Sequence, residues 1–406
     1  MKVLIISYGG LAEDARVIFR EYARQGIELY IISPSKIAVN KTYYPSGFLE
    51  YEKEKFKENY IFFAVDLLNS GKKHYFKMFN PWQMFKVFKK IKPDIIHVFN
   101  EYSSTHLTEA IFLRNLLYKK TVPVLPYVFE NIEFTSAKLK PGLSSYFLRN
   151  IARRILRPIK FIYNLNNVSG VVGANNDSLK IIRNTGLNVP MKRIFPAIDL
   201  NLFYKKDKLE CRNKIGLNPS KKYAGYFGRI VEGKGLQTLI LAIKKLTDYD
   251  LIILGGGLEK NSYEDKIKQF VKEQGMEEKV HFIKGTTMDK LNDYYNSLDV
   301  FVLASETLTD WKEQYGRVLV EAMSCQLAIV GSSSGAIAEV LEGYPRALIF
   351  KEKDIEGLAD KIKKSEHLSF PQDYDNQKFL EKFSVSNFVK ENINFYNKLL
   401  NTNGKN

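Results

Sequence analysis

Short apolar runs alternate with longer stretches of helical spacing along most of the chain. Residues 2–8 form an apolar run that ends at Gly9-Gly10, residues 12–25 carry apolar side chains at helical spacing, and residues 28–33 are apolar again. A strand, a helix and a second strand in this order predict a βαβ unit. Because the alternation continues, we expect parallel sheets that helices cover on both faces.

The predicted strands fall into two series, separated by a polar, irregular segment at residues 200–207 that we interpret as a linker. Predicted helices of the second series lie near residues 234–245, 263–273, 288–296, 317–324 and 336–342. The strands are expected at residues 2–8, 28–33, 62–65, 94–99, 122–128, 170–172 and 193–195, and then at 222–227, 250–254, 280–283, 298–304, 327–331 and 347–350.

Length and composition agree with two soluble domains. A chain of 406 residues can form two cores of ordinary size. Its 45% apolar and 26% charged residues are typical of globular proteins, and no apolar run approaches the ~20 residues that cross a bilayer. The N-terminal run predicts a buried strand, not a secretory signal. Only Cys211 and Cys325 are available, so we expect no disulfide framework and a cytoplasmic location.

The formal net charge of +16 predicts a surface that attracts anions, such as nucleic acid, an anionic membrane or phosphorylated substrates. Lysines and aromatic residues cluster at positions 72–92. Arg149, Arg153 and Arg157 recur every four residues on an amphipathic stretch. This basic stripe is either a solvated helix face or a surface that rests on an anionic leaflet.

Two carboxylates flank a predicted junction between a loop and a helix. Glu313 and Glu321 lie eight residues apart around Gly316, which places Glu313 in the loop and Glu321 about one turn inside the helix. The first amides of the helix, near Gly316, Arg317 and Val318, can bind an anion. Hydroxyls of a ribose and of a hexose can donate to the carboxylates. This arrangement predicts a site for a sugar joined to a nucleoside diphosphate.

A second motif, Gly-Arg-Ile-Val-Glu-Gly-Lys-Gly, occupies residues 228–235. Arg229 and Lys234 lie on either side of a glycine-containing turn, so both can contact one diphosphate, each charge-assisted contact contributing about 1.5 to 3 kcal/mol. The motif also matches the start of a Walker A loop. Gly235 stands where that loop needs a Ser or Thr to ligate Mg²⁺, which argues against a nucleotide triphosphatase.

The two motifs resemble the E-x7-E and G-R-x4-K-G elements of retaining GT-B glycosyltransferases of family 4. Gly9-Gly10 and residues 196–199 and 334–339 also occur in the family's order, so the resemblance covers nearly the whole chain. It implies two Rossmann-like, doubly wound parallel-sheet domains that face a cleft. Residues 1–198, completed by a C-terminal helix at 385–406, would bind the acceptor, and residues 199–384 the nucleotide sugar.

The resemblance also implies roles for individual residues. Arg229 and Lys234 would hold the donor diphosphate and, with Glu313 facing the donor sugar, form the catalytic set. Glu321 would bind the ribose hydroxyls. The implied donor-binding residues are Gly9, Gly10, Gly228, Gly316, Arg317, Val318 and Glu321.

On the acceptor side the chain departs from the family pattern. The family's usual histidine after a first-domain strand is replaced by Val-Phe-Glu-Asn at residues 128–131. Glu101, Glu130 and Asn131 follow predicted strands, so we expect them to meet an acceptor hydroxyl. His97, inside a predicted strand, is interpreted as a packed residue.

The expected activity is that of a retaining hexosyltransferase which moves a sugar from a UDP- or GDP-linked donor to a glycan or lipid-linked acceptor. The expected setting is bacterial cell-surface polysaccharide synthesis, in the cytoplasm or on the inner face of the plasma membrane. No metal or cofactor is expected, because paired aspartates and His/Cys clusters are missing from the sequence. One alternative is a nucleotide-sugar epimerase of the same fold. Another is a basic nucleic-acid-binding protein, which the charge suggests but no recognisable binding module supports.

Overall fold

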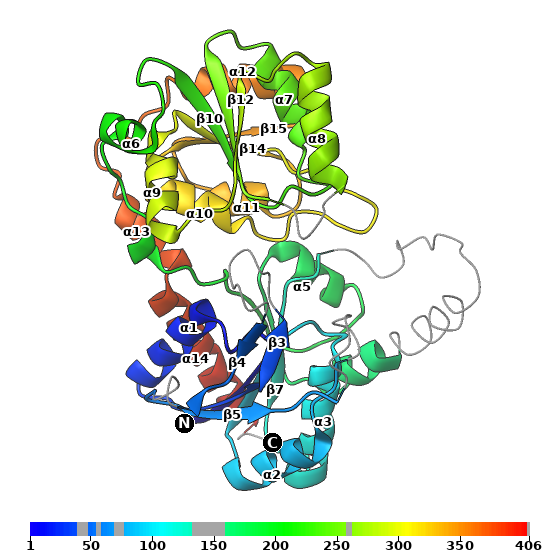
Figure 1. Cartoon of the computed structure of the whole chain (residues 1–406). Helices are drawn as coiled ribbons and strands as arrows, with labels where there is room; N and C mark the ends of the chain where they lie inside the picture. The colour runs from blue at the N-terminus through cyan, green and yellow to red at the C-terminus, as the bar shows by residue number, and fades with distance from the viewer. Residues whose placement is uncertain (39–47, 54–57, 69–76, 132–158, 257–261, 404–406) are drawn as a thin grey trace, which may run out of the picture. The chain divides into compact units, whose positions relative to one another are not determined.

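The computed structural model describes residues 1–38, 48–53, 58–68, 77–131, 159–256 and 262–403 (Figure 1). The chain divides into two compact units. The first unit combines Met1–Ala197 with Val385–Asn406, and the second is Ile198–Ser384. Both are built on a parallel sheet, and each is described below by itself.

Seven parallel strands of the described residues form the sheet of the first unit, in the order β5-β2-β1-β6-β7-β8-β9. A short antiparallel pair, β3 (Lys36–Ala38) and β4 (Phe48–Glu50), lies outside it. The strands of the large sheet are β1 (Lys2–Ser7), β2 (Glu28–Pro34), β5 (Ile61–Val65), β6 (Ile95–Phe99), β7 (Val124–Val128), β8 (Val171–Gly173) and β9 (Met191–Arg193), and the helices are α1 (Glu13–Arg24), α2 (Pro81–Ile91), α3 (Thr105–Tyr118), α5 (Asn176–Arg183) and α14 (Val385–Asn403).

The apolar run of β1 is buried because helices cover both faces of this sheet. Leu4 and Ile6 face a core that includes side chains of α2 and α3, whereas Val3 and Ile5 face a core with α1 and α14. Alternate residues of a strand point to opposite faces, so a central parallel strand needs apolar residues at every position. This explains why β1 has no polar alternation.

The last helix, α14, is held in the first unit by a buried polar contact. The hydroxyl of Tyr396 lies 2.9 Å from the hydroxyl of Tyr22 on α1 and 2.6 Å from Nδ1 of His97 on β6. All three side chains are fully buried. Burial lowers the pKa of His97 to about 3, so its ring is neutral at physiological pH. The prediction that His97 is a packed strand residue is confirmed.

Six parallel strands of the described residues form the second sheet, in the order β12-β11-β10-β13-β14-β15. Its strands are β10 (Lys222–Phe227), β11 (Tyr249–Leu254), β12 (Val280–Ile283), β13 (Val300–Leu303), β14 (Ala328–Ser332) and β15 (Ala347–Phe350), and its helices are α6 (Lys208–Ile215), α7 (Leu236–Lys244), α8 (Ser262–Glu273), α9 (Met288–Ser297), α10 (Arg317–Ser324), α11 (Ile337–Leu341), α12 (Ile355–Ser365) and α13 (Asn376–Leu380).

Several predicted boundaries were wrong by one or two residues. Gly233 and Gly235 adopt positive φ angles of 88° and 64°, so α7 begins at Leu236 and not at Lys234. The predicted strands at residues 170–172 and 193–195 are displaced by one and two residues from the observed β8 and β9. The α12 and α13 helices were not predicted.

The segment interpreted as an irregular linker is partly ordered. Residues 200–202 form a 3-10 turn, and α6 follows directly after the segment. Phe203 is buried and packs edge-on against Tyr295 of α9. The interpretation of residues 200–207 as an irregular polar segment therefore missed the buried side chain of Phe203.

None of the helices in the described part of the chain is both long enough and apolar enough to pass through a bilayer.

Replacing Tyr396 with Phe should destabilise the first unit by about 1 to 3 kcal/mol, because Tyr22 and His97 each lose a buried hydrogen-bond partner. Amide hydrogen exchange of β1 and β6 measures this effect. Tyr204 is 54% exposed, and the Tyr204→Phe variant should leave the exchange rates unchanged. Equal protection in both variants would show that the buried hydroxyl contributes nothing.

Candidate active site

The N-terminus of α10 has the geometry that the sequence predicted. Gly316 precedes the helix with φ 75°, and a Cβ at this position would lie 3.0 Å from side-chain atoms of Leu303 and Leu319. A left-handed residue without a side chain is therefore required here. Among the described residues, no side chain caps the first amides of the helix. Glu313 lies in the preceding loop and Glu321 lies one turn inside the helix.

Glu313 and Lys234, from the two separate motifs, form a buried ion pair. Nζ of Lys234 lies 2.6 Å from Oε2 of Glu313, and the two side chains are 12% and 8% exposed. Ser305 donates its hydroxyl to the same oxygen at 2.8 Å. The ammonium also lies 4.7 Å from the centre of the Trp311 ring. The sequence predicted both charged residues for the site, but not their mutual contact.

Glycines allow the loops around this ion pair to pack closely. A Cβ on Gly235 would lie 1.8 Å from the carbonyl oxygen of Ala304, just after β13. A Cβ on Gly255, after β11, would lie 2.0 Å from the carbonyl oxygen of Gly228, after β10. Three loops therefore meet at the carboxyl ends of neighbouring parallel strands, the edge at which such sheets bind ligands.

The loop after β14 completes this edge. The amide of Ala336 donates to the carbonyl of Glu313 at 3.0 Å, and a Cβ on Gly335 would lie 2.0 Å from the same oxygen. These contacts hold the backbone of Glu313 while Lys234 and Ser305 hold its carboxylate. The orientation of Glu313 is therefore established without any ligand.

Glu321 is positioned by two further side chains. Tyr295 of α9 donates its hydroxyl to Oε2 at 2.7 Å, and Nε of Arg317 lies 3.1 Å from Oε1. Burial raises the pKa of Glu321, whereas Tyr295 and Arg317 act in the opposite direction. Each carboxylate oxygen can still accept a second hydrogen bond. The participation of Tyr295 was not predicted, because it is distant in sequence and belongs to no motif.

Arg229 differs from Lys234 in its surroundings. Its side chain is exposed. Its backbone carbonyl accepts a hydrogen bond of 2.6 Å from Tyr226. Within the described residues, its guanidinium has neither a hydrogen bond nor an ion pair with another side chain. The sequence grouped Arg229 with Lys234 as one diphosphate clamp, but only Lys234 is neutralised by a carboxylate.

The acceptor-side candidates lie together at the ends of β6 and β7. The Glu101 carboxylate accepts hydrogen bonds from the amide of Phe129, at 3.0 and 3.2 Å, and from the amide of Glu130, at 3.1 Å. Asn131 is buried. The side chain of Asn175, which the sequence did not single out, donates to the carbonyl of Phe129 at 3.3 Å. Glu101 thus shapes the loop that carries Glu130 and Asn131, and contact of these residues with an acceptor stays a prediction.

The Gly9-Gly10 turn follows β1 in the first unit. A Cβ on Gly10 would lie 2.9 Å from the side chain of Ser33 on β2, whereas Gly9 has nothing within 4 Å of that position. Gly10 is therefore required by a close approach within the unit. The donor contact expected of both glycines stays a prediction.

A polar cluster that sequence reasoning missed lies in the same unit. Nζ of Lys77 lies 2.5 Å from the hydroxyl of Tyr8, and the rings of Tyr8 and His106 are stacked with their centres 5.9 Å apart. Nδ1 of His106 lies 3.0 Å from Nδ2 of Asn100. Burial lowers the pKa of His106 to about 4 and raises the pKa of nearby Glu109 to about 8. These residues share no spacing in the sequence that would have revealed the cluster.

The predicted basic stripe of Arg149, Arg153 and Arg157 lies outside the described residues. Of the other basic cluster, Lys86 and residues 89–90 are exposed on α2. In the part of the chain that the structure describes, no three His, Cys, Asp or Glu side chains are grouped as ligands for a metal ion.

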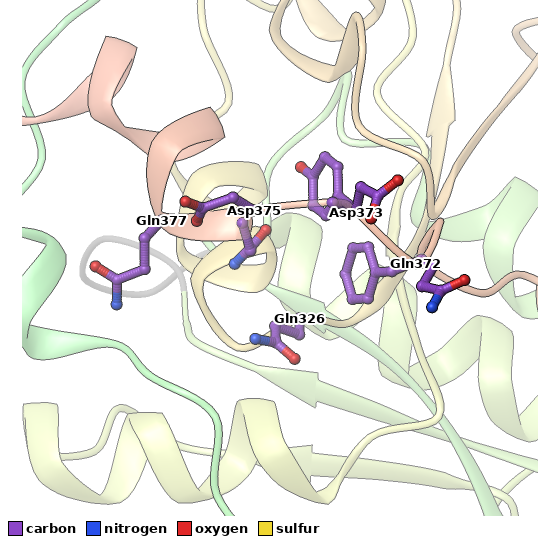
Figure 2. Close-up of a pocket in the computed structure, with 8 residues that line it drawn as sticks. Gln326, Gln372, Asp373, Asp375 and Gln377 are labelled. Atoms are coloured by element: carbon purple, nitrogen blue, oxygen red, sulfur yellow. The ribbon is translucent and has the colours of Figure 1, made fainter.

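A separate hollow of about 540 Å³ lies just beyond the C-terminal end of α10, the end opposite Gly316. Figure 2 shows side chains that line it. Gln326, which follows the helix, and Asp375 and Gln377 around the start of α13 line it. The rings of Phe370 and Tyr374 stack beside it, with their centres 4.9 Å apart. Because this hollow is at the C-terminal end of α10, it is not part of the candidate site.

Residues 207–379 match the family described as "Glycosyl transferases group 1". A lipopolysaccharide core biosynthesis mannosyltransferase, LpsB of Rhizobium meliloti, is 29% identical over 182 residues, which are 43% of this chain and 50% of that protein. An uncharacterized glycosyltransferase of Methanocaldococcus jannaschii, MJ1607, is 28% identical over 236 residues, 56% of each chain. The D-inositol 3-phosphate glycosyltransferase of Mycobacterium ulcerans is 27% identical over 158 residues, 38% of this chain and 33% of that protein. The similarity therefore spans between a third and just over half of these relatives' length.

Solved structures resemble nearly the whole chain. Sucrose-phosphate synthase from Thermosynechococcus elongatus has a TM-score of 0.69 at 17% identity, over 99% of this chain and 100% of that one. Alr3699/HepE of Anabaena, in complex with UDP, has a TM-score of 0.68 at 16% identity, over 98% and 100%. The chain has the GT-B fold. The predicted fold class is confirmed, and the family match of the second unit supports a glycosyltransferase.

Glu109 should make the stability of the GT-B protein depend on pH. Its pKa rises from 4.5 to about 8 in the folded chain. Between these two pH values the folded state therefore binds more protons than the unfolded state. The free energy of unfolding should consequently fall as pH rises from about 4.5 to about 8. Replacement by Gln removes this loss.

Urea unfolding midpoints at pH 5 and pH 8.5 measure the difference. Wild type should lose more stability than the Glu109→Gln variant over this interval. Glu342 is exposed, so the Glu342→Gln variant should follow wild type. Parallel curves for wild type and the Glu109→Gln variant would contradict the buried, protonated state of this carboxyl.

Proposed function

We propose that the chain is a retaining glycosyltransferase that moves a sugar from a nucleotide-sugar donor to a glycan or lipid-linked acceptor. The observation that carries the proposal is the buried contact between Lys234 and Glu313 beside the N-terminus of α10. It joins both sequence motifs at the carboxyl edge of the second sheet. Cations, carboxylates and a helix N-terminus without a side-chain cap in one place match the chemistry of a sugar joined to a diphosphate.

In this proposal the donor diphosphate binds the amides at the start of α10 and the guanidinium of Arg229. Arg229 contributes the full positive charge, since Glu313 neutralises Lys234. Lys234 positions Glu313 toward the donor sugar and has further N–H groups for the diphosphate. As the bond to the sugar breaks, negative charge builds on the diphosphate, and these preorganised donors stabilise it without a metal ion.

The acceptor hydroxyl would attack the sugar on the face from which the diphosphate leaves and pass its proton to the departing diphosphate oxygen, so no covalent intermediate forms and no residue acts as nucleophile. Glu321 would accept the ribose hydroxyls with its second lone pairs, while Tyr295 and Arg317 hold it. Glu101, Glu130 and Asn131 would line the acceptor side. None of these steps requires a group from outside the chain and its substrates.

The comparisons support this class of donor and a role in cell-surface polysaccharide synthesis. HepE structures contain UDP and UDP-glucose. LpsB is a mannosyltransferase of lipopolysaccharide core synthesis. We propose a UDP- or GDP-linked sugar as the donor for this chain.

Nucleotide binding tests the proposed donor site. Wild type should be stabilised by UDP or GDP in a thermal-shift titration, and 2′-deoxy forms should bind at least tenfold more weakly. The Glu321→Gln variant should bind the ribonucleotide about tenfold more weakly, a loss of about 1.4 kcal/mol. It should also lose the preference for ribose over deoxyribose. A preference that survives this substitution would rule out the ribose assignment.

The Glu277→Gln variant is the matched control, because Glu277 is an exposed acid of the same unit. Its nucleotide affinity should equal that of wild type. Failure of every nucleoside diphosphate to stabilise wild type would overturn the proposed function itself.

We further propose that the first unit rests on an anionic membrane, at the inner face of the plasma membrane. Trp82 on α2 is 66% exposed, and Phe112 and Leu116 on α3 are 59% and 58% exposed. The helices α2 and α3 are in contact, and Lys86 lies over the Trp82 ring. Exposed aromatic and aliphatic side chains beside lysines are typical of surfaces that bind anionic lipid.

Removing apolar side chains from this surface should weaken membrane binding. The Trp82→Ala and Leu116→Ala variants should each lower binding to vesicles of phosphatidylcholine and phosphatidylglycerol at least threefold in a sedimentation assay. Leu209, on α6 of the second unit, is 53% exposed, and the Leu209→Ala variant should bind as wild type does. Equal binding by all three variants would exclude this surface.

A further inference from the structure

Lys77 is a buried cation that no carboxylate among the described residues neutralises. Its side chain is only 6% exposed. Its ammonium donates to the Tyr8 hydroxyl at 2.5 Å and lies 5.0 Å from the centre of the same ring. Within the described residues, no carboxylate forms an ion pair with it. An ammonium withdrawn from water without an opposite charge is costly, so such a group calls for an anionic ligand.

The surroundings of Lys77 do not supply the missing negative charge. The stacked ring of His106 is neutral at physiological pH. Lys160, a second basic group, donates to the Thr105 hydroxyl at 2.9 Å. The acid near them is Glu109, whose pKa burial raises to about 8, so it is mostly protonated at pH 7. The N-terminus of α3, which begins at Thr105, adds a partial positive charge.

These residues come from three separate segments at one edge of the first sheet. Tyr8 follows β1 directly, and His106 follows β6 at the start of α3. Lys77 follows β5 along the chain, in a segment whose neighbouring residues pair with those just after β5: the amide of Leu68 donates to the carbonyl of Met78 at 2.9 Å. The edge is the carboxyl one, where α/β sheets bind ligands.

We propose that Lys77 and Tyr8 form a binding site for a phosphoryl group of the acceptor. The inference rests on the proposed glycosyltransferase function and names the class of its acceptor: a hydroxyl compound that carries a phosphate, either soluble or lipid-borne. One ammonium hydrogen is used by Tyr8, and the other two are directed to phosphate oxygens. The phosphate supplies the counter-charge that the described protein residues do not supply to Lys77.

Binding of glycerol 3-phosphate, measured by titration calorimetry on the full chain, tests the proposal. Wild type should bind this probe, and the Lys77→Gln variant should bind it at least tenfold more weakly. The Lys89→Gln variant makes the same charge change at an exposed position of α2 and should bind within twofold of wild type. Equal affinities of the two variants, or no binding by wild type, would overturn the proposal.

Failure of this site can be distinguished from failure of the donor site. UDP and GDP titrations of the same variants report on the second unit, and the Lys77→Gln variant should retain the nucleotide affinity of wild type. Loss of nucleotide binding in wild type would count against the proposed function. Loss restricted to glycerol 3-phosphate in the Lys77→Gln variant would support the acceptor site.

Thermal unfolding without ligand provides a second measurement. It distinguishes a lysine that binds a ligand from a lysine that only stabilises the fold. The Lys77→Met variant keeps most of the side-chain volume and removes the uncompensated charge, so its Tm should exceed that of wild type. A lower Tm would show that Lys77 stabilises the unit and would contradict a role in ligand binding.

Vesicles distinguish the two sources of phosphate. The vesicle control is Lys266→Gln, because Lys266 is exposed on α8 of the second unit, away from the proposed membrane surface. If the phosphate is lipid-borne, the Lys77→Gln variant should bind vesicles with phosphatidic acid at least threefold more weakly than the Lys266→Gln variant does. If it is soluble, the two variants should bind these vesicles equally and differ only toward glycerol 3-phosphate. Both results support the site, because the vesicles decide only the source of the phosphate. Equal affinity of the Lys77→Gln and Lys89→Gln variants for glycerol 3-phosphate overturns the site in either case.

Discussion

The buried ion pair between Lys234 and Glu313 is the contact on which the candidate donor site depends. Both charges are largely withdrawn from water, which is tolerable only because they meet and because Ser305 adds a hydrogen bond. Removing one partner would leave the other charge uncompensated. The loops after β10 and β13 are consequently constrained by one interaction, and the glycine at position 235 lets them approach closely enough to form it.

In the first unit, neutral side chains form the buried polar contact that joins distant segments of the chain. Tyr396 of α14 joins Tyr22 and His97 in a fully buried set of contacts that carries no net charge, because burial keeps the His97 ring neutral. Neutral hydrogen bonds avoid the desolvation cost of an ion pair. They therefore suit a contact that joins α14, which is distant in sequence, to α1 and β6 in the core of the unit.

Two cations differ from these groups, because no carboxylate among the described residues forms an ion pair with either of them. Arg229 is exposed at the carboxyl edge of the second sheet, and Lys77 is buried at the carboxyl edge of the first. The net charge of +16 indicated a preference for anions but not its location. The structure identifies two side chains that could account for the preference for anions. Arg229 is proposed to bind the donor diphosphate, and Lys77 is proposed to bind an acceptor phosphate.

The sequence by itself determined the parallel α/β architecture and the junction at Gly316, because apolar periodicity and a left-handed glycine act within a few residues. It misplaced the start of α7, since the positive φ angles of Gly233 and Gly235 depend on how closely neighbouring loops approach. Only the tertiary structure decided that Lys234 meets Glu313 and that Lys77 has no carboxylate partner among the described residues. Both facts depend on contacts between segments far apart in the chain, and strand order in the sheet, not sequence spacing, brings such segments together.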